Sequence, residues 1–237
     1  MRELPAPAPP GDRAVGQLIA ETIRCYGDHF WRALPLGLPL AIANAVISGH
    51  TTKAQVAILC GFAPLFSAAY IYASLLALDL RGVSRSRILF ATVLGMLIWL
   101  PAPVGLLAYV LPMFLWLAFF GLAVPAALAE RLGLRAAIAR GRRLASADFV
   151  HALGALCGLL IVVMLSAGVL SALLHGQGES TRRAASFLAL LVLSPLLYLG
   201  PALLYTDQEA RIGVRKPRRG RRRRAGLDAD AAGPRES

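Results

Sequence analysis

Charged residues are scarce in this sequence. They make up 16% of its 237 residues, and 57% of the residues are hydrophobic, whereas soluble domains carry about 25% charged and about 45–50% apolar residues. The mean hydropathy is +0.61. The hydrophobic residues also lie in uncharged blocks that are too long for helices or strands with one polar face. This composition excludes a soluble globular protein and predicts an integral membrane protein.

Motifs for metal, redox or nucleotide chemistry are missing. Cys25, Cys60 and Cys157 are far apart and form no Cys-x-x-Cys pair, so neither a metal site nor a redox site is predicted. The Gly-rich loops that bind nucleotides and the serine elbow of hydrolases are missing as well. We therefore predict no enzyme activity, no catalytic residue, no metal and no cofactor. We expect structural or interfacial roles for the four histidines, which are His29, His50, His151 and His175.

Acidic residues are few and do not cluster within the apolar part of the chain. Three of the thirteen stand singly at the ends of predicted spans, and these are Asp79, Glu130 and Asp148. We interpret them as interfacial partners of nearby arginines. The predicted pairs are Asp79 with Arg81, and Glu130 with Arg131 or Arg135.

Long uncharged runs predict six membrane spans. A helix needs about 20 apolar residues to cross about 30 Å of hydrocarbon, where its backbone groups must be paired within the helix. The longest uncharged run, Ile88–Ala129, is long enough for two passes, and Pro101 and Pro103 predict a tight turn in its middle. The six predicted spans are 33–52, 56–78, 86–101, 105–129, 150–174 and 185–206.

The distribution of arginine predicts the orientation of the spans. Six spans place both termini on one side, and of the 25 basic residues only Lys53, Arg182 and Arg183 fall on the other side. Lys and Arg next to spans are retained in the cytoplasm. We therefore predict that both termini of this multi-pass protein are cytoplasmic, and that it lies in the cell (cytoplasmic) membrane.

Two segments outside the spans have helical amphipathic patterns. In the first, apolar residues recur at helical spacing from Val15 to Phe30, opposite charged residues such as Glu21 and Arg24. In the second, Leu134 to Ala145 follows the same pattern. Each leads directly into a predicted span, so we interpret both as interfacial helices rather than solvated connectors.

An internal repeat relates these two regions. A shift of residues 19–49 by 119 positions gives nine identities in 31, among them Arg24 with Arg143 and Phe30 with Phe149. The ends of later spans also resemble each other, as in Pro125–Leu128 and Pro201–Leu204. We predict three helical hairpins, with boundaries near Gly82 and Gly133. Repeated hairpins are common in membrane folds and do not by themselves imply transport.

Several segments resemble the membrane domain family of glycerophosphoryl diester phosphodiesterases. They are Val15–Ile19, Tyr26–Phe30, Leu122–Glu130, Leu134–Ile138, Gly141–Leu144 and Leu203–Asp207. The resemblance extends over about 13–211. It implies a multi-span bacterial or archaeal membrane module, which in some proteins precedes a phosphodiesterase domain. The clustered carboxylates and histidines of such a catalytic domain are not present in these 237 residues, so we expect a membrane module only.

A transporter is the alternative function. Ion-coupled carriers place an ionisable residue or a broken helix near the membrane midplane, and the predicted spans hold no midplane carboxylate, Lys or Arg. Pro64, Pro112 and Pro195 can break helices, which leaves a pathway for a neutral or lipid-like solute open. The polar residues of the spans are neutral and more often join helices together. They are Asn44, Ser67, Ser74, Ser166, Ser171 and Ser194.

The segment after the last span is strongly basic. With few apolar residues to bury, it is predicted to be disordered. Basic residues beside a membrane attract anionic lipid, and no aromatic residue lies among them to stack on bases. We therefore predict contact with lipid headgroups and no specific nucleic acid. The predicted contact residues are Arg215, Lys216, Arg218, Arg219, Arg221, Arg222, Arg223 and Arg224.

Together these patterns predict an all-α polytopic membrane protein. It comprises a Pro-rich extension over 1–12, a six-span membrane domain over 13–211 and a basic cytoplasmic tail over 212–237. We expect a non-catalytic membrane module, structural or scaffolding in the envelope or in lipid homeostasis, whose partners are anionic membrane lipids. A sealed bundle would favour this function, whereas a polar cavity that reaches the midplane would favour transport.

Overall fold

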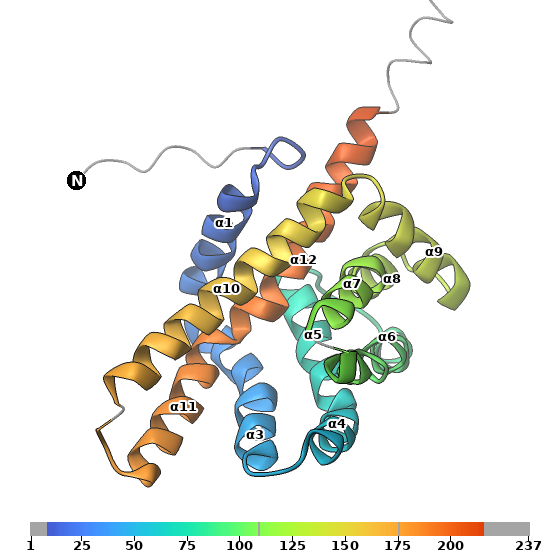
Figure 1. Cartoon of the computed structure of the whole chain (residues 1–237). Helices are drawn as coiled ribbons and strands as arrows, with labels where there is room; N and C mark the ends of the chain where they lie inside the picture. The colour runs from blue at the N-terminus through green and yellow to red at the C-terminus, as the bar shows by residue number, and fades with distance from the viewer. Residues whose placement is uncertain (1–8, 109, 175, 216–237) are drawn as a thin grey trace, which may run out of the picture.

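The computed structural model describes residues 9–108, 110–174 and 176–215. It is all-helical, with 82% helix and no strand within those ranges, and the helices form one bundle (Figure 1). In chain order the elements are α1 Val15–Asp28, α2 Phe30–Ala33, the 3₁₀ helix η1 Leu34–Gly37, α3 Leu38–Ile47, α4 Thr52–Gly61, α5 Ala63–Ala77, α6 Arg85–Trp99, the 3₁₀ helix η2 Ala102–Ala108, α7 Val110–Phe120, α8 Ala123–Ala129, α9 Leu134–Ala145, α10 Phe149–Leu173, α11 Glu179–Leu193 and α12 Pro195–Arg215.

Five stretches of helix are long and apolar enough to cross a membrane. They are Phe30–Ile47, Arg85–Gly105, Pro112–Ala129, Phe149–Leu170 and Glu179–Gly213. A sixth is formed by α4 and α5 if these two helices, which meet at a bend of 53°, make a single span. The structure is thus consistent with the multi-pass membrane protein that the sequence predicts.

Two of the spans break beside Pro64 and Pro195, two of the three prolines that the sequence analysis names as helix breakers. α4 and α5 separate at Phe62, and α11 and α12 separate at Ser194, in each case just before a proline that has no N–H to continue the preceding helix. α7 and α8 separate around Gly121. Where a tight turn is predicted at 101–105, residues 102–105 form the start of η2.

Helices do occupy the two segments predicted to be amphipathic. One face of α1 is buried at Leu18, Thr22 and Tyr26, and this helix packs on α10 and α12. α9 packs on α8, where a Cβ on Gly141 would lie only 2.6 Å from the backbone nitrogen of Ala123. Glycine allows this close approach because it has no side chain.

The core of the bundle lies where the apolar helices cross. α5 packs on α6 and α12, and α10 packs on α11 and α12. A Cβ on Gly37 would collide with the backbone carbonyl of Leu191, so η1 lies directly against α11. Leu94 and Leu199 are fully buried in the larger core cluster, together with Tyr70 and Tyr198.

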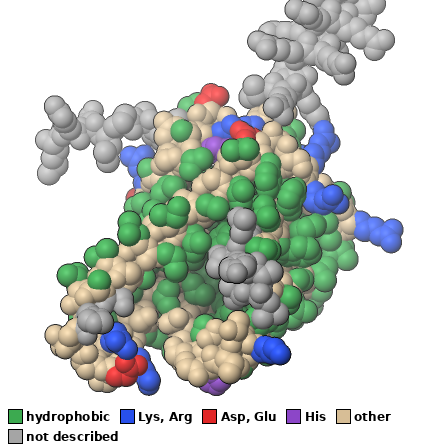
Figure 2. All heavy atoms as spheres, in the orientation of Figure 1, with side chains coloured by type: hydrophobic (Ala, Val, Ile, Leu, Met, Phe, Trp, Pro, Cys, Tyr) green, Lys and Arg blue, Asp and Glu red, His purple; other side chains and the backbone are tan. Residues whose placement is uncertain are grey.

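Charged side chains lie at the ends of the bundle. In Figure 2 they gather at the top and right of the view and again at its lower edge, while the broad middle is hydrophobic. The ends of α5, α8 and α12 lie together with the starts of α6 and α10 at one end, where Gly11 also contacts α12. The α3–α4 and α10–α11 connections form the opposite end.

Candidate functional site

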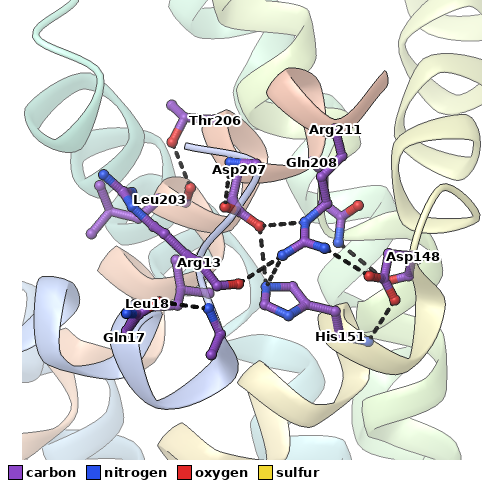
Figure 3. A network of polar contacts seen from close by, with 12 residues as sticks. Arg13, Gln17, Leu18, Asp148, His151, Leu203, Thr206, Asp207, Gln208 and Arg211 are labelled. Carbon is purple, nitrogen blue, oxygen red and sulfur yellow. Dashed lines mark hydrogen bonds and ion pairs between the residues drawn. The ribbon is translucent and has the colours of Figure 1, made fainter. Parts of the chain in front are cut away.

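A buried polar network joins α10, α12 and the segment before α1 (Figure 3). Asp148 is the N-cap of α10, and its Oδ1 accepts a hydrogen bond from the His151 backbone nitrogen at 3.1 Å. Asp207 of α12 is fully buried. Its Oδ2 lies 3.1 Å from His151 Nε2 and 2.9 Å from Arg211 Nε.

Arg211 links the three parts of this network. Its Nη1 donates to Asp148 Oδ2 at 2.8 Å, and its Nη2 donates to the carbonyl of Arg13 at 2.7 Å. The backbone nitrogen of Gly11 donates to Asp207 Oδ1 at 2.8 Å. Arg211 donates to both carboxylates, so its one positive charge offsets part of their two negative charges. The network therefore fastens the segment before α1 to the ends of two spans.

A third carboxylate, that of Glu130, fastens α9 to the same end. Arg140 Nε donates to Glu130 Oε1 at 2.7 Å, and the Tyr205 hydroxyl donates to the same oxygen at 3.0 Å. Arg140 Nη2 also lies 3.8 Å from Glu209 Oε1. The predicted pairing of Glu130 with Arg131 or Arg135 is wrong, because the chain reverses at Arg131 (φ +54°) and α9 returns Arg140 to Glu130. The predicted pair of Asp79 with Arg81 is confirmed, at 3.0 Å.

A cavity of about 430 Å³ lies inside the bundle. Its walls come from α3 to α7 and from α10 to α12. Among the lining residues, Leu156 and Leu160 lie midway along α10, whereas Asn44 and Pro103 lie near the end opposite the termini. The volume falls in the range of about 300–1,000 Å³ that is typical of small-molecule sites, which are also mostly apolar.

Aromatic side chains form one wall of this cavity. The ring of Trp99 lies 5.5 Å from that of Phe66 and 6.0 Å from that of Tyr198, measured between centroids. Tyr70 donates its hydroxyl to the Gly121 carbonyl at 3.0 Å. Trp99 Nε1 is buried and has no hydrogen-bond partner within the part of the chain that the structure describes. A buried donor without a partner is rare in proteins.

The structure tests few of the predicted site residues. Arg215 is the last residue of α12, and its side chain is not described. The other predicted lipid-contact residues lie outside the described residues, and these are Lys216, Arg218, Arg219, Arg221, Arg222, Arg223 and Arg224. Within the described ranges, no three His, Cys, Asp or Glu side chains are placed to hold a metal ion.

Sequence reasoning missed both main features of the site. Asp207 and His151 lie within or at the start of apolar helices, and ionisable residues in such positions usually have partners on neighbouring helices. That signal could have predicted the pair. The cavity had no comparable signal, because its lining residues are ordinary apolar residues from distant segments.

Comparisons with protein-family models, curated proteins and solved structures found no match to this chain.

Proposed function

We propose that this protein is a non-catalytic module of the cytoplasmic membrane that binds the acyl chain of a membrane lipid inside its helical bundle. The cavity of about 430 Å³ carries this proposal. Its occupant must be apolar, because water enters a cavity only where polar partners are available. Lipid chains are the abundant apolar molecules at that depth.

The cavity has an approach from the lipid phase. Met164 lines it and is also 49% exposed on the outer surface of α10. Ile47 and Pro103 extend the lining toward the end opposite the termini. A lipid acyl chain that enters beside Met164 would come from the half of the membrane at the end of the bundle opposite the termini.

The charge distribution supports cytoplasmic termini. Within the described residues, arginines from the α5–α6 connection, α9 and the end of α12 lie at the end of the bundle that holds the segment before α1. The opposite end holds Lys53, Arg182 and Arg183, and both of these arginines pair with Glu179. Loops with an excess of Lys and Arg are retained in the cytoplasm.

The arrangement as three hairpins with two interfacial helices is part of the proposal. Helix starts support the repeat: α1 begins at Val15 and α9 at Leu134, and α2 begins at Phe30 and α10 at Phe149, so both pairs are 119 residues apart. In the second and third hairpins a carboxylate at the end of a span, Glu130 or Asp207, binds a neighbouring segment. The resemblance to the phosphodiesterase membrane domain family, also part of the proposal, fits a role in lipid homeostasis.

Filling the cavity tests the proposal. Leu160→Trp places a large ring among the lining residues, and Leu117→Trp does so from α7. The matched control is Leu165→Trp, on the same helix as Leu160 but 65% exposed at the outer surface. Native mass spectrometry of the solubilised protein should show a copurified lipid on the wild type and on Leu165→Trp. Both cavity variants should lose it.

Two results would contradict the proposal. One is a wild-type protein that carries no bound lipid when it is extracted in a mild detergent. The other is a folded Leu160→Trp or Leu117→Trp protein, with an unchanged helical spectrum, that retains the same lipid as the control.

A lipid carrier is the second candidate, and the broken helices favour it. The bend of 53° between α4 and α5 and the break before Pro195 both border the cavity, through Phe66 and Leu197. Discontinuous helices form the binding sites of many transporters. Reconstituted protein should then accelerate the movement of a labelled lipid between leaflets. A binding module without transport would leave that rate at the level of protein-free vesicles.

A further inference from the structure

The mostly apolar wall of the interior cavity includes one unpaired hydroxyl, that of Tyr198. This residue lines the cavity from α12 and is 3% exposed. Its hydroxyl has no hydrogen-bond partner among the residues that the structure describes. Tyr70 on the same wall differs, because its hydroxyl donates to the Gly121 carbonyl at 3.0 Å. The Tyr198 hydroxyl is therefore a donor and acceptor that the protein itself leaves unused.

The Tyr198 hydroxyl faces the cavity. Within the described part of the chain, the buried side-chain atoms that lack a partner and are sealed by neighbouring atoms belong to Tyr26, Trp99 and Gln208. The Tyr198 hydroxyl also lacks a partner, but it is not sealed in this way. Because Tyr198 is buried and lines the cavity, the open space beside its hydroxyl is the cavity.

Pro201 leaves a backbone acceptor in the same stretch of α12. It lies inside the helix and lines the cavity. A proline has no N–H, so the Leu197 carbonyl lacks the hydrogen bond that the residue four positions later donates in a regular helix. Leu197 lines the cavity as well. This part of α12 thus offers the cavity a hydroxyl at Tyr198 and a carbonyl at Leu197.

Charge limits what can occupy the cavity. Among the residues that the structure describes, no Asp, Glu, Lys, Arg or His lines it. An ionised headgroup inside the cavity would lose its hydration without gaining a counter-charge, which is costly. A hydroxyl group is uncharged and both donates and accepts. It can therefore donate to the Leu197 carbonyl and accept from the Tyr198 hydroxyl at once.

We propose that the interior cavity selects an uncharged lipid with a hydroxyl at its polar end, such as a monoacylglycerol, and that Tyr198 and the Leu197 carbonyl bind this hydroxyl. The proposal rests on the proposed function and adds the chemical class of the ligand. An acyl chain alone would leave the Tyr198 hydroxyl unpaired in apolar surroundings, which is unfavourable. Tyr198 is thus the residue that determines specificity.

Binding of three lipids with the same oleoyl chain to the full-length protein in detergent tests this proposal, with bound lipid measured by native mass spectrometry. Monooleoylglycerol has free hydroxyls, methyl oleate has none, and oleoyl-lysophosphatidylglycerol adds a charged phosphate. The wild type should bind monooleoylglycerol most tightly of the three.

Tyr198→Phe removes the hydroxyl and keeps the ring that packs on Trp99, so the variant should fold. It should bind monooleoylglycerol about fivefold more weakly, as expected for the loss of one hydrogen bond. Its binding of methyl oleate should not weaken. Tyr72→Phe is the matched control, because Tyr72 is 43% exposed on α5 and does not line the cavity. This control should bind all three lipids as the wild type does.

Several results would overturn the proposal. Tyr198→Phe could bind monooleoylglycerol as tightly as the wild type, or it could lose affinity for methyl oleate to the same extent. The wild type could bind methyl oleate or the charged lipid at least as tightly as monooleoylglycerol. Each of these results would leave a lipid site in the interior cavity intact. Binding of none of the three lipids would overturn the proposed function together with this inference.

Discussion

The carboxylate of Asp207 joins α12 to α10 and to the segment before α1. Its side chain is fully buried and receives donors from the backbone of Gly11, from Arg211 and from His151. Asp79, in contrast, forms an exposed pair with Arg81, and its side chain is 78% exposed. The same residue type thus occurs in two ion pairs that differ chiefly in burial.

This difference predicts unequal costs of substitution. Asp207→Ala should lower the free energy of unfolding by about 3 kcal/mol, because it leaves buried donors and part of the Arg211 charge without a partner. Asp79→Ala should change it by less than about 1 kcal/mol. Unfolding of the solubilised protein in mixed micelles measures both. Similar losses in the two variants would show that the buried network does not hold this end together.

Cys25 on α1 should react slowly with alkylating reagents. Burial raises the pKa of its thiol, and the carboxylates of Asp28 and Glu21 raise it further. Less thiolate is then present at any pH below that raised pKa, and the thiolate is the reactive form.

Alkylation rates across pH measure this effect in a protein with Cys60→Ala and Cys157→Ala. The rate for Cys25 should keep rising above the pH at which a free cysteine peptide levels off. Asp28→Asn should lower the pKa and speed the reaction at pH 8, whereas Asp12→Asn, in the segment before α1, should not. A rate profile equal to that of the free peptide would contradict the structure at this position.

At the scale of elements, sequence patterns predicted single uninterrupted helices best. The predicted span 150–174 corresponds to α10 at Phe149–Leu173, and 86–101 corresponds to α6 at Arg85–Trp99. A charged residue marks the start of each helix, Arg85 for α6 and Asp148 for α10, and Pro101 follows the end of α6. The predicted spans 56–78 and 185–206 break beside Pro64 and Pro195, which the sequence marks as helix breakers. The break around Gly121 in 105–129 was missed, because the composition is apolar on both sides of it.

The interior cavity marks the limit of prediction from sequence. Leu156, Met113 and Tyr198 meet there from three different helices. Only the packing of the whole bundle decides which apolar residues leave space between them. The partner of Glu130 was missed for a related reason, since the reversal of the chain at Arg131 brings a residue ten positions away into contact.

Docking of α9 on α8 depends on one glycine. Gly141→Ala should lower the free energy of unfolding by about 1–3 kcal/mol, because the new Cβ would meet the backbone of Ala123 and push the helices apart. The matched control is Gly27→Ala in α1, where no atom lies within 4 Å of the new Cβ. That substitution should be neutral or stabilise the protein by up to about 1 kcal/mol. Equal stabilities of the two variants would show that α9 does not pack as described.

At the scale of the whole molecule, charge asymmetry fixes the expected orientation. Ser180 lies in the first turn of α11, and Ser146 follows α9 at the other end of the bundle; both are exposed. In a protein without its native cysteines, Ser180→Cys should react with a membrane-impermeant maleimide in intact cells. Ser146→Cys should react only after the membrane is permeabilised. The reverse pattern would invert the orientation.

Locating a photoreactive lipid chain on the protein shows directly whether a lipid enters the interior cavity. A phospholipid with a diazirine on its acyl chain is supplied to membranes that contain the protein, and crosslinked residues are identified by mass spectrometry of peptides. If a lipid chain is bound inside the bundle, adducts should form on residues that line the interior cavity, such as Leu156 and Leu160, and should be lost in Leu117→Trp. Adducts confined to outward residues of the same helix, such as Leu165 and Val169, would show that lipid surrounds the bundle without entering it.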